Sequence, residues 1–396
     1  MELKESEALG TFRADVRKWI DESVPPHLKG LRQGIAQGPG LAEEEMAPLV
    51  RALAAKGWLA PDIPKEWGGA GFDFMQSVIF REECSRAGLP PRYVFGLEML
   101  APVLQKFGTE EQKKRFLLPT VRGEIKWAQG YSEPGAGSDL ASLGLRADVT
   151  DEGFVLNGQK IWTSQAHHAD WTFMLARTDP KATKKQDGIS FLLAKLDSPG
   201  ITVRPITTID GFSHFCEVFF ENARVPRDQL VGQLHKGWTV AKALLGHERF
   251  GHPTANAFIM FRAIENVKAS ARKVKVGSAT LWDDRNLRRR VATLEMDAEV
   301  LQATRARFLS MVHDGEPPGP ESMIFKLFGA ELIQCIVELH QEVLGPEGVT
   351  WGPEPFGLEV GEVAIHAANI RAATIRGGTS EVHRNIVADR ILGLPH

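Results

Sequence analysis

The strongest constraint on the fold is a change of hydrophobic period along the chain. Up to about residue 120, apolar residues recur three and four positions apart, as at Phe12, Val16 and Ile20, which is the spacing of one helix face. Short runs rich in Val, Ile, Phe and Thr follow and predict an antiparallel sheet. Helical patterns then return. We therefore expect an α+β chain with a helical domain over 1–120, a central antiparallel β-barrel-like domain over 121–235 and a C-terminal four-helix bundle over 236–396.

Turn residues and helix-length patterns refine this expectation. Asn157-Gly158 and Pro199-Gly200 are expected to lie in turns between strands. The bundle is expected from four helical patterns, which are WTVAKALLGHERF, NLRRRVATLEMDAEVLQATRARFLSMV, ESMIFKLFGAELIQCIVELHQEVLG and VAIHAANIRAATI.

Charge and cysteine content exclude several classes of protein. A net charge of −3 gives no broad attraction to nucleic acid or to an anionic membrane, and no stretch approaches the ~20 apolar residues of a membrane span. The N-terminus has neither signal-peptide nor transit-peptide character, so we expect a cytoplasmic protein. Cys84, Cys216 and Cys335 follow no metal or disulfide spacing and are expected to be buried thiols.

A glycine-rich loop, GYSEPGAGSD at 130–139, follows a strand-like segment. It is no nucleophile elbow, because Pro134 stands where the G-x-S-x-G motif needs glycine. It is no dinucleotide fingerprint either, because the third glycine and the surrounding βαβ unit are missing. The loop offers Ser132, Ser138 and backbone N–H groups to an anion or a polar heterocycle, or it is a plain structural turn.

The segment HERFGH at 247–252 resembles a zinc-binding H-E-x-x-H motif but is one residue too long. His247 and His252 therefore diverge around a helix, and no metal site is expected. Glu248 remains as a carboxylate on a largely apolar helix. It is either the partner of Arg249 or another cation, or a desolvated base with a raised pKa. Two further features have a purely structural interpretation. Trp162 is most simply a core residue, and RNLRRR at 285–290 is a solvated helix face.

Three segments in this order and spacing, YSEPGAGSDLASL, NGQKIWTSQAHHADW and RGGTSEVHRNIVADRILGLP, resemble the acyl-CoA dehydrogenase family. The resemblance covers essentially the whole chain and is closest to bacterial members, including those that act on pimeloyl-CoA and on steroid side chains. It implies FAD as cofactor, oxidation of an acyl-CoA thioester to trans-2-enoyl-CoA, and electron-transfer flavoprotein as the electron acceptor.

The same resemblance implies a FAD site made from several segments. The first comprises Gln129, Tyr131, Ser132, Gly137 and Ser138. The second places Trp162 beside the isoalloxazine and Ser164 near flavin N5, and the third contributes Gly378, Thr379 and Glu381. The loop QEVLGPEG resembles one that holds the adenosine diphosphate half of FAD from a neighbouring subunit, through Glu342 and Gly345. There Glu342 replaces the usual Gln and Pro346 the usual Gly.

The resemblance also implies the position of the catalytic base. Gly377 stands where many members carry the catalytic Glu, and glycine has no side chain to take a proton. A second branch of the family supplies its base from the first helix of the C-terminal domain as Glu followed by Arg, the pair found here at Glu248-Arg249. We expect Glu248 to take the α-proton while the β-hydride leaves to flavin N5, with N–H groups near Gly377 stabilising the enolate.

Substrate and assembly remain open at this stage. The candidate substrate contacts are Ser138, Arg249, Arg376 and Gly377. For Arg376 three roles are open: it binds a second carboxylate on the substrate, pairs with Glu248 or contacts solvent. The missing side chains at Gly246, Gly251 and Gly377 favour a branched, ring-bearing or otherwise bulky acyl group. The assembly is a homotetramer, a homodimer or an α2β2 heterotetramer. The alternatives to a dehydrogenase are a flavin-dependent monooxygenase on the same fold and a non-catalytic or half-site subunit of a heteromeric acyl-CoA dehydrogenase.

Overall fold

The computed structural model describes residues 6–29, 43–89, 95–251, 257–313, 319–351 and 358–395. Contacts divide the chain into two compact units, each assembled from segments far apart in the sequence. The first, here called the bundle unit, comprises Met1–Leu41, Phe74–Pro90 and Arg249–His396. The second, the sheet unit, comprises Ala42–Asp73 and Pro91–Glu248.

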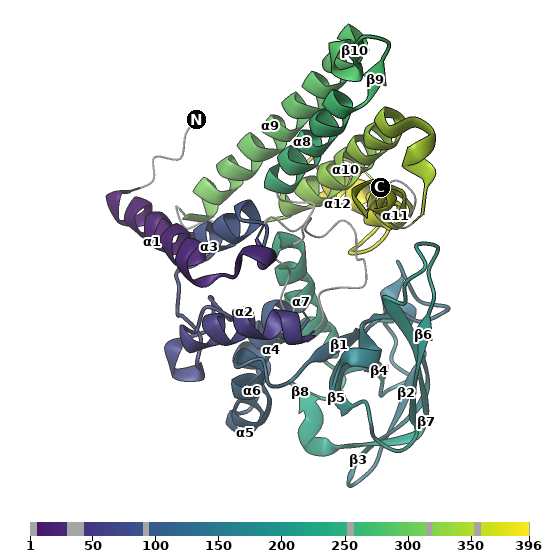
Figure 1. The fold of residues 1–396 in the computed structure, drawn as a ribbon. Helices are drawn as coiled ribbons and strands as arrows, with labels where there is room; N and C mark the ends of the chain where they lie inside the picture. The colour runs from purple at the N-terminus through teal and green to yellow at the C-terminus, as the bar shows by residue number, and fades with distance from the viewer. Residues whose placement is uncertain are drawn as a thin grey trace. The chain divides into compact units, whose positions relative to one another are not determined.

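The sheet unit contains one sheet with the strand order β6-β7-β3-β2-β4-β5-β8, and β1 lies beside β4 (Figure 1). Its strands are β1 (Trp127–Gly130), β2 (Arg146–Val149), β3 (Gly153–Ser164), β4 (Trp171–Arg177), β5 (Ile189–Lys195), β6 (Ile201–Ile206), β7 (Phe215–Pro226) and β8 (Leu230–Val231). Most pairings are antiparallel, as the alternating pattern predicts. The exceptions are the parallel pairs that β4 forms with β1 and β2. A buried core that includes Phe154, Leu156 and Met174 packs beneath the sheet.

Helices complete the sheet unit. They are α2 (Glu43–Ala55), α4 (Ala101–Phe107), α5 (Glu110–Gln112) and α6 (Leu118–Val121), and α7 (Gly237–Gly251) leads out of the unit. The Gln112 side chain ties α5 to the sheet, because its amide nitrogen donates to the carbonyls of Asp228 and Leu230 at 2.7 Å each. Thr109 and Gln112 also form a capping box that begins α5.

The long β3–β7 pair contains two irregularities. Between Leu156 and Gly158 two steps along β3 match three along β7, and between Lys160 and Thr163 three steps match two. The prediction of a turn at Asn157-Gly158 is therefore wrong: the pair lies inside β3. The Asn157 side chain instead accepts the N–H of Asn222, which has φ 52° in the bulge of β7. An Asn-Gly pair serves a bulge as well as a hairpin, since both need unusual backbone angles.

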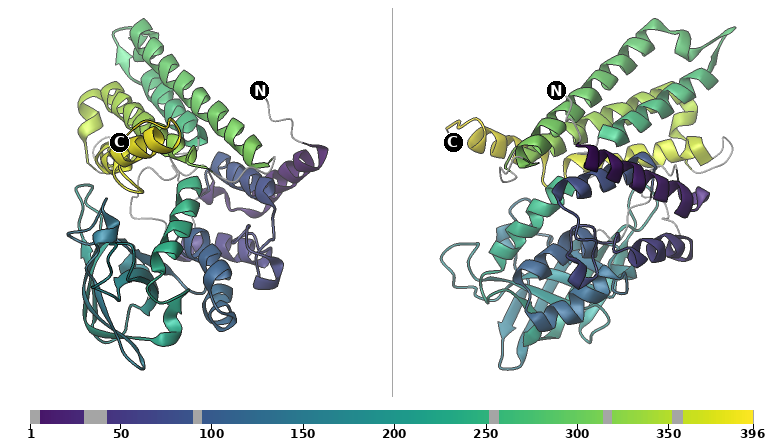
Figure 2. Two further views of the ribbon diagram at one scale, coloured as in Figure 1. Left: turned by 180° about the vertical axis from the view of Figure 1, so that it is seen from behind. Right: turned by 90° about the vertical axis from the view of Figure 1, so that its left-hand side faces the viewer.

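The bundle unit is helical. Its helices are α1 (Glu7–Ser23), α3 (Phe74–Arg86), α8 (Ala257–Lys273), α9 (Arg285–His313), α10 (Ser322–Leu344), α11 (Leu358–Ile370) and α12 (Ser380–Arg390). A short hairpin of β9 (Lys275–Val276) and β10 (Ala279–Thr280) joins α8 to α9, and these two helices lie side by side (Figure 2).

The helical C-terminal domain is confirmed, but the predicted set of four helices omits α8. This helix buries Met260, Ile264, Val267 and Ala271, which stand three and four residues apart and mark its inner face. Together α8, α9, α10 and α11 surround a common core that includes Phe325 and Ile333. The solvated face expected at 285–290 is confirmed for the four arginines, while Leu287 in that run is buried.

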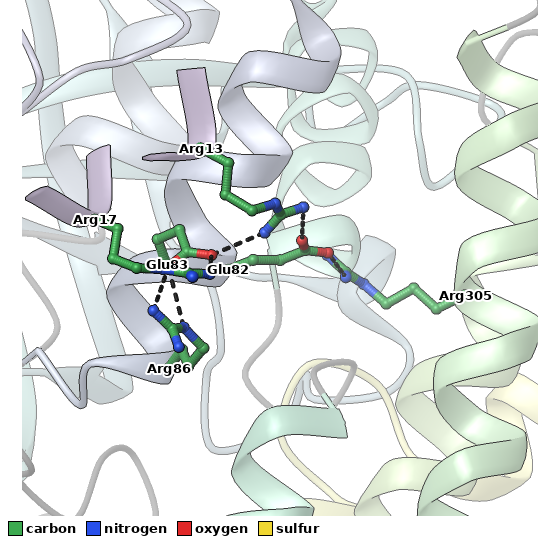
Figure 3. A network of polar contacts seen from close by, with 6 residues as sticks. All are labelled: Arg13, Arg17, Glu82, Glu83, Arg86 and Arg305. Carbon is green, nitrogen blue, oxygen red and sulfur yellow. Dashed lines mark hydrogen bonds and ion pairs between the residues drawn. The ribbon is translucent and has the colours of Figure 1, made fainter. Parts of the chain in front are cut away.

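An ion network connects three helices of the bundle unit (Figure 3). Glu83 on α3 receives hydrogen bonds from Arg13 and Arg17 on α1 and from Arg86 on its own helix. The neighbouring Glu82 receives hydrogen bonds from Arg13 and from Arg305 on α9, at 3.1 Å each. The N-terminal helix is thereby tied to α3, and α3 to α9.

The structure also tests the expectations for the cysteines and for membrane spans. Cys84 and Cys216 are buried as expected, but Cys335 is exposed. Its position on α10 falls on the face that carries Glu331 and Glu338, opposite the buried Ile333 and Ile336. Among the described helices, none is both long enough and apolar enough to cross a membrane.

Candidate active site

The glycine-rich loop at 131–139 leaves the end of β1 and is fastened at its base. The N–H of Ile161 on β3 donates to the carbonyl of Ser132 at 2.9 Å, and Glu133 and Ala136 exchange backbone hydrogen bonds at 2.9 and 3.0 Å. Beyond this bridge Gly137 is exposed, and a Cβ added there would meet no atom within 4 Å. The loop is therefore held at its base and open at its tip, which leaves its backbone available to a ligand.

Beneath this loop lies a buried ion pair. The ammonium of Lys160 on β3 donates to Glu133 Oε1 at 2.7 Å and to the carbonyl of Tyr131 at 3.1 Å. The Glu133 carboxylate also accepts the N–H groups of Gly144 at 2.5 Å and Leu145 at 2.9 Å. Lys160 is fully buried, and this burial lowers its pKa to about 8 even though the Glu133 charge acts in the opposite direction.

Trp162 lies two residues further along β3, in the second bulge of the strand. Its φ is 57°, a left-handed conformation that costs a bulky residue roughly 1–3 kcal/mol. The indole is 54% exposed and meets Phe215 edge-on at 5.8 Å between ring centroids. The interpretation of Trp162 as a core residue is therefore wrong. The bulge instead turns a large flat ring toward solvent, where a ligand ring can stack on it.

The other predicted residues of the sheet unit surround the loop and the bulge. Gln129 lies within β1 opposite Phe173 and is half-buried, and Ser164 ends β3 opposite Phe215. Ser138 is exposed beyond the Glu133–Ala136 bridge. Because the Ile161–Ser132 hydrogen bond joins the loop to β3, residues some thirty positions apart in sequence share one edge of the sheet unit.

In the bundle unit, the predicted segment RGGT forms a tight turn before α12. Gly377 and Gly378 have φ of 68° and 97°, which side-chain-bearing residues rarely adopt. Thr379 caps α12 by accepting the N–H of Val382 at 3.2 Å. Glu381 lies in the first turn of the helix, where a backbone hydrogen bond and the Thr379 side chain lower its pKa. The two glycines are thus required by the backbone conformation.

A second buried lysine supports this turn. Lys326 on α10 is fully buried, and its ammonium donates to the carbonyl of Gly378 at 2.5 Å. His383 packs against the same glycine, because a Cβ at Gly378 would lie only 2.7 Å from its Nε2. Arg376, just before the turn, is partly buried, and this burial lowers its pKa. Within the described part of the chain its guanidinium has no hydrogen-bond or ion-pair partner.

The predicted adenosine loop follows α10. Glu342 is bound by Arg290 of α9 through two hydrogen bonds of 2.6 and 2.9 Å. Gly345 has φ 58°, and a Cβ there would meet nothing within 4 Å. The loop is therefore open at Gly345, while the Glu342 carboxylate is already neutralised within its own unit.

Models of three protein domains match this sequence in chain order. An acyl-CoA dehydrogenase N-terminal domain matches residues 6–124, a middle domain 128–223 and a C-terminal domain 235–392. Acyl-CoA dehydrogenase IpdE1 of Mycobacterium tuberculosis is 39% identical over 391 residues, which cover 97% of each chain. This chain belongs to the acyl-CoA dehydrogenase family.

Solved structures agree with this assignment. The Tcur3481-Tcur3483 steroid ACAD is similar with a TM-score of 0.85 and 32% identity over 100% of both chains. The ChsE4-ChsE5 complex from Mycobacterium tuberculosis gives a TM-score of 0.82 and 30% identity, again over 100% of both chains. Acyl-CoA dehydrogenases are FAD-dependent oxidoreductases of lipid metabolism, so FAD is the cofactor of this enzyme.

The residues of the acyl-CoA dehydrogenase sheet unit fit FAD. An exposed indole in a strained conformation offers an aromatic face to the isoalloxazine, and the open Gly137 leaves room for a close approach of the cofactor to the backbone. The exposed hydroxyl of Ser138 and the half-buried Ser164 supply polar groups. A flat apolar surface together with polar groups is typical of a cofactor site.

Two predicted catalytic residues lie outside the description of side chains. Glu248 and Arg249 belong to the backbone of α7, but the structure describes no side chain between residues 246 and 251. The HERFGH segment therefore stays untested as a metal site. Among the described residues no cluster of His, Cys, Asp and Glu could hold a metal ion.

Sequence reasoning missed the two buried lysines and Glu133. A signal for Lys160 exists, because it stands two and three repeats of the strand period after the inward-facing Leu156 and Phe154. For Lys326 a similar signal exists on α10, because the buried Met323, Ala330 and Ile333 stand three residues before it and four and seven residues after it. Lysine at such positions is rarely buried without a partner, so each predicts a polar group that comes from elsewhere in the chain.

Proposed function

We propose that this enzyme oxidises an acyl-CoA thioester to the trans-2-enoyl-CoA, with Glu248 as the base that removes the α-proton. The observation that carries the proposal is Gly377, whose φ of 68° suits glycine and whose position supplies a carboxylate in many acyl-CoA dehydrogenases. A base is then needed from another element. The Glu248-Arg249 pair on α7 matches the branch of the family that provides one there.

The chemistry explains why a carboxylate is required. The α-proton of a thioester is weakly acidic, so the base must have a raised pKa in a site from which water is excluded. Bound FAD supplies the two-electron acceptor for the hydride that leaves the β-carbon. The backbone N–H groups of the Gly377–Gly378 turn, held by Lys326, are suited to stabilise the developing negative charge on the thioester oxygen.

The proposed cofactor contacts lie on segments already described. Trp162 and the loop from Tyr131 to Ser138 bind the isoalloxazine side, with Gln129 and Ser164 beside them. Thr379 and Glu381 at the start of α12 are further candidate FAD contacts from the family resemblance, and Gly345 is the candidate contact for the adenosine half of a FAD bound mainly by another subunit. Electron-transfer flavoprotein is the proposed acceptor of the electrons.

The proposed substrate class is a bulky, ring-bearing acyl-CoA. A similar solved protein supports it, since it is named a steroid ACAD and shares 32% identity over the full chain. Gly377 carries no side chain, which favours a bulky acyl group. Arg376 is a half-buried cation without a partner among the described residues, and it is a candidate contact for a carboxylate or ketone oxygen on the acyl group.

The first test is anaerobic bleaching of the flavin absorption band by a panel of acyl-CoAs, with wild type and Glu248→Gln. We expect bulky ring-bearing acyl-CoAs to bleach the flavin of wild type. The bleaching rate of Glu248→Gln should be lower by a factor of at least 10³. Undiminished bleaching by Glu248→Gln would place the base elsewhere. Bound flavin that no acyl-CoA reduces, combined with substrate-dependent oxygen consumption once reduced flavin is supplied, would instead identify the monooxygenase.

A second candidate is a half-site subunit of a heteromeric acyl-CoA dehydrogenase. Glu342 favours it, because its carboxylate is bound by Arg290 and, unlike the usual amide, has no N–H to donate to a cofactor. Two similar structures are named for pairs of proteins. Mass measurement and FAD stoichiometry of the purified chain test it: one FAD per chain in a homomer contradicts the half-site, and flavin bound only after a partner is added supports it.

A further inference from the structure

The Lys160–Glu133 pair is a buried cation and carboxylate that the proposed chemistry does not use. Both residues belong to the sheet unit, and neither contacts substrate in the proposed reaction. Lys160 is fully buried and the Glu133 side chain is 10% exposed. Placing two charges in such a site costs several kcal/mol of desolvation per ion, which their attraction offsets only when the geometry is good.

Several hydrogen bonds connect the pair to the glycine-rich loop at 131–139, here called the flavin loop. Lys160 donates both to Glu133 and to the carbonyl of Tyr131, the first residue of the loop. Glu133, the third residue, uses its remaining capacity on the N–H groups of Gly144 and Leu145 beyond the loop. The loop is therefore fastened on its inner side by one ammonium group and one carboxylate.

The strand that provides Lys160 also provides the flavin-facing indole. Ile161 donates its N–H to Ser132 and Trp162 follows directly in the bulge. Three consecutive residues of β3 thus hold the loop from below, bind its backbone and present the aromatic ring. A displacement of Lys160 would therefore move both the loop and the indole, which are the two surfaces proposed to contact the isoalloxazine.

We propose that Lys160, in its charged form and paired with Glu133, is the positioning residue that shapes the flavin-binding edge, so that FAD affinity depends on its protonation. Its pKa of about 8 places the loss of that charge within the working range of many enzymes. The charged groups that face Lys160 are Glu133, which favours the ammonium, and Arg177, which disfavours it. A neutral amine keeps a weak hydrogen bond to Tyr131 but no longer attracts the carboxylate.

The same loop supplies a matched control. Lys185 pairs with Asp139 at 2.6 Å, but the side chains are 63% and 58% exposed. An exposed pair of this kind contributes little, since water and salt screen it. Lys185→Met therefore removes an equal charge that contacts the end of the loop, from the segment between β4 and β5, without removing the loop's inner support.

The test measures FAD release from the full-length holoenzyme by the fluorescence of the freed flavin after dilution, without substrate. We expect Lys160→Met to raise the dissociation constant about tenfold or more at neutral pH, and Lys185→Met less than about twofold. Wild type and Lys185→Met should lose affinity as pH rises above about 8, by up to tenfold per pH unit. Glu133→Gln should move that break to lower pH, because the lysine loses its counter-ion.

Each result decides between a positioning role and a purely structural one. A Lys160→Met variant that binds FAD like wild type, with only a lower melting temperature, overturns the proposal. So does a wild-type dissociation constant that stays constant across pH 8 or a break that Glu133→Gln leaves in place. The wild-type and Glu133→Gln profiles decide the matter if Lys160→Met does not fold. Because no acyl-CoA is present, the outcome is independent of whether Glu248 is the base.

Discussion

Glu83 in the bundle unit and Lys160 in the sheet unit are both buried charges, but their environments act on them differently. Burial alone would raise the pKa of Glu83, yet hydrogen bonds from Arg17 and Arg13 and the charge of Arg86 lower it (Figure 3). At Lys160, burial outweighs the single Glu133 partner and lowers the pKa to about 8. A lowered pKa favours the charged form of a carboxylate and disfavours the charged form of a lysine.

The number and kind of partners explain the difference. Three arginines surround a side chain that is 2% exposed, and two of them are themselves 46% exposed, so their own desolvation is small. Lys160 has one carboxylate, which it shares with two backbone N–H groups. The network at Glu83 stabilises the fold, whereas burial lowers the pKa of Lys160, beneath the loop at 131–139, to about 8 despite its pair with Glu133. Such perturbed groups are concentrated at functional sites.

The largest expected effect is that of Lys160→Met on stability. The substitution leaves the Glu133 carboxylate buried without its cation, which costs about 3–5 kcal/mol in the free energy of unfolding. Urea denaturation of the FAD-bound enzyme measures it, with Lys185→Met as the control. A loss below about 1 kcal/mol would mean that the Lys160–Glu133 pair contributes no more than an exposed surface pair. The difference proposed between Lys160 and Glu83 would then not hold.

Glu83→Gln is expected to cost about 2 kcal/mol, less than Lys160→Met. The amide keeps the shape and one acceptor oxygen, and water can solvate the half-exposed Arg17 and Arg86 when the negative charge is gone. The same urea experiment tests the order of the two effects. If Glu83→Gln proved the more damaging, the arginines would depend on this carboxylate more than their exposure indicates.

Acid should weaken wild type in part through Glu83. Its folded pKa lies below the ordinary 4.5, so the unfolded chain binds the proton first as the pH falls. The stabilisation is complete above the unfolded pKa and is lost as the pH falls through the folded pKa. The difference in unfolding free energy between wild type and Glu83→Gln should therefore shrink between about pH 5 and pH 3. A difference that stays constant over this range contradicts a lowered pKa.

The smallest effect is expected for Arg17→Met, at about 1 kcal/mol or less. Arg17 is 46% exposed, and Glu83 keeps Arg13 and Arg86 after its removal. Thermal unfolding with Arg17→Lys as a companion separates charge from geometry, because lysine retains the charge but not the two-point hydrogen bond. Equal losses in both variants would show that the paired geometry carries the whole contribution.

Much of the site was predictable because it depends on local backbone requirements. Gly377 and Gly378 occupy left-handed positions, and Thr379 caps the helix that follows; adjacent glycines followed by threonine predict such a turn from sequence. The loop after β1 was predicted for the same reason. The helical, sheet and helical order also followed from hydrophobic period alone.

Other features needed the tertiary structure. The bulges of β3 arise from its register with β7, which lies more than fifty residues away, so Asn157-Gly158 resembled a hairpin turn and Trp162 resembled a core residue. The helix α8 was missed although Met260, Ile264 and Val267 mark a buried face. Cys335 was expected to be buried, and only the packing of α10 determined which face of that helix is solvated.

The sequence by itself determined the order of the domains, the glycine-dependent turns and the family to which the chain belongs, because these depend on residue type and spacing within short segments. Only the tertiary structure decided that Trp162 is exposed in a strained conformation, that Lys160 meets Glu133 and that Lys326 meets Gly378. Each of these depends on a partner that another part of the chain brings within hydrogen-bond or register distance, and local patterns carry no information about that partner.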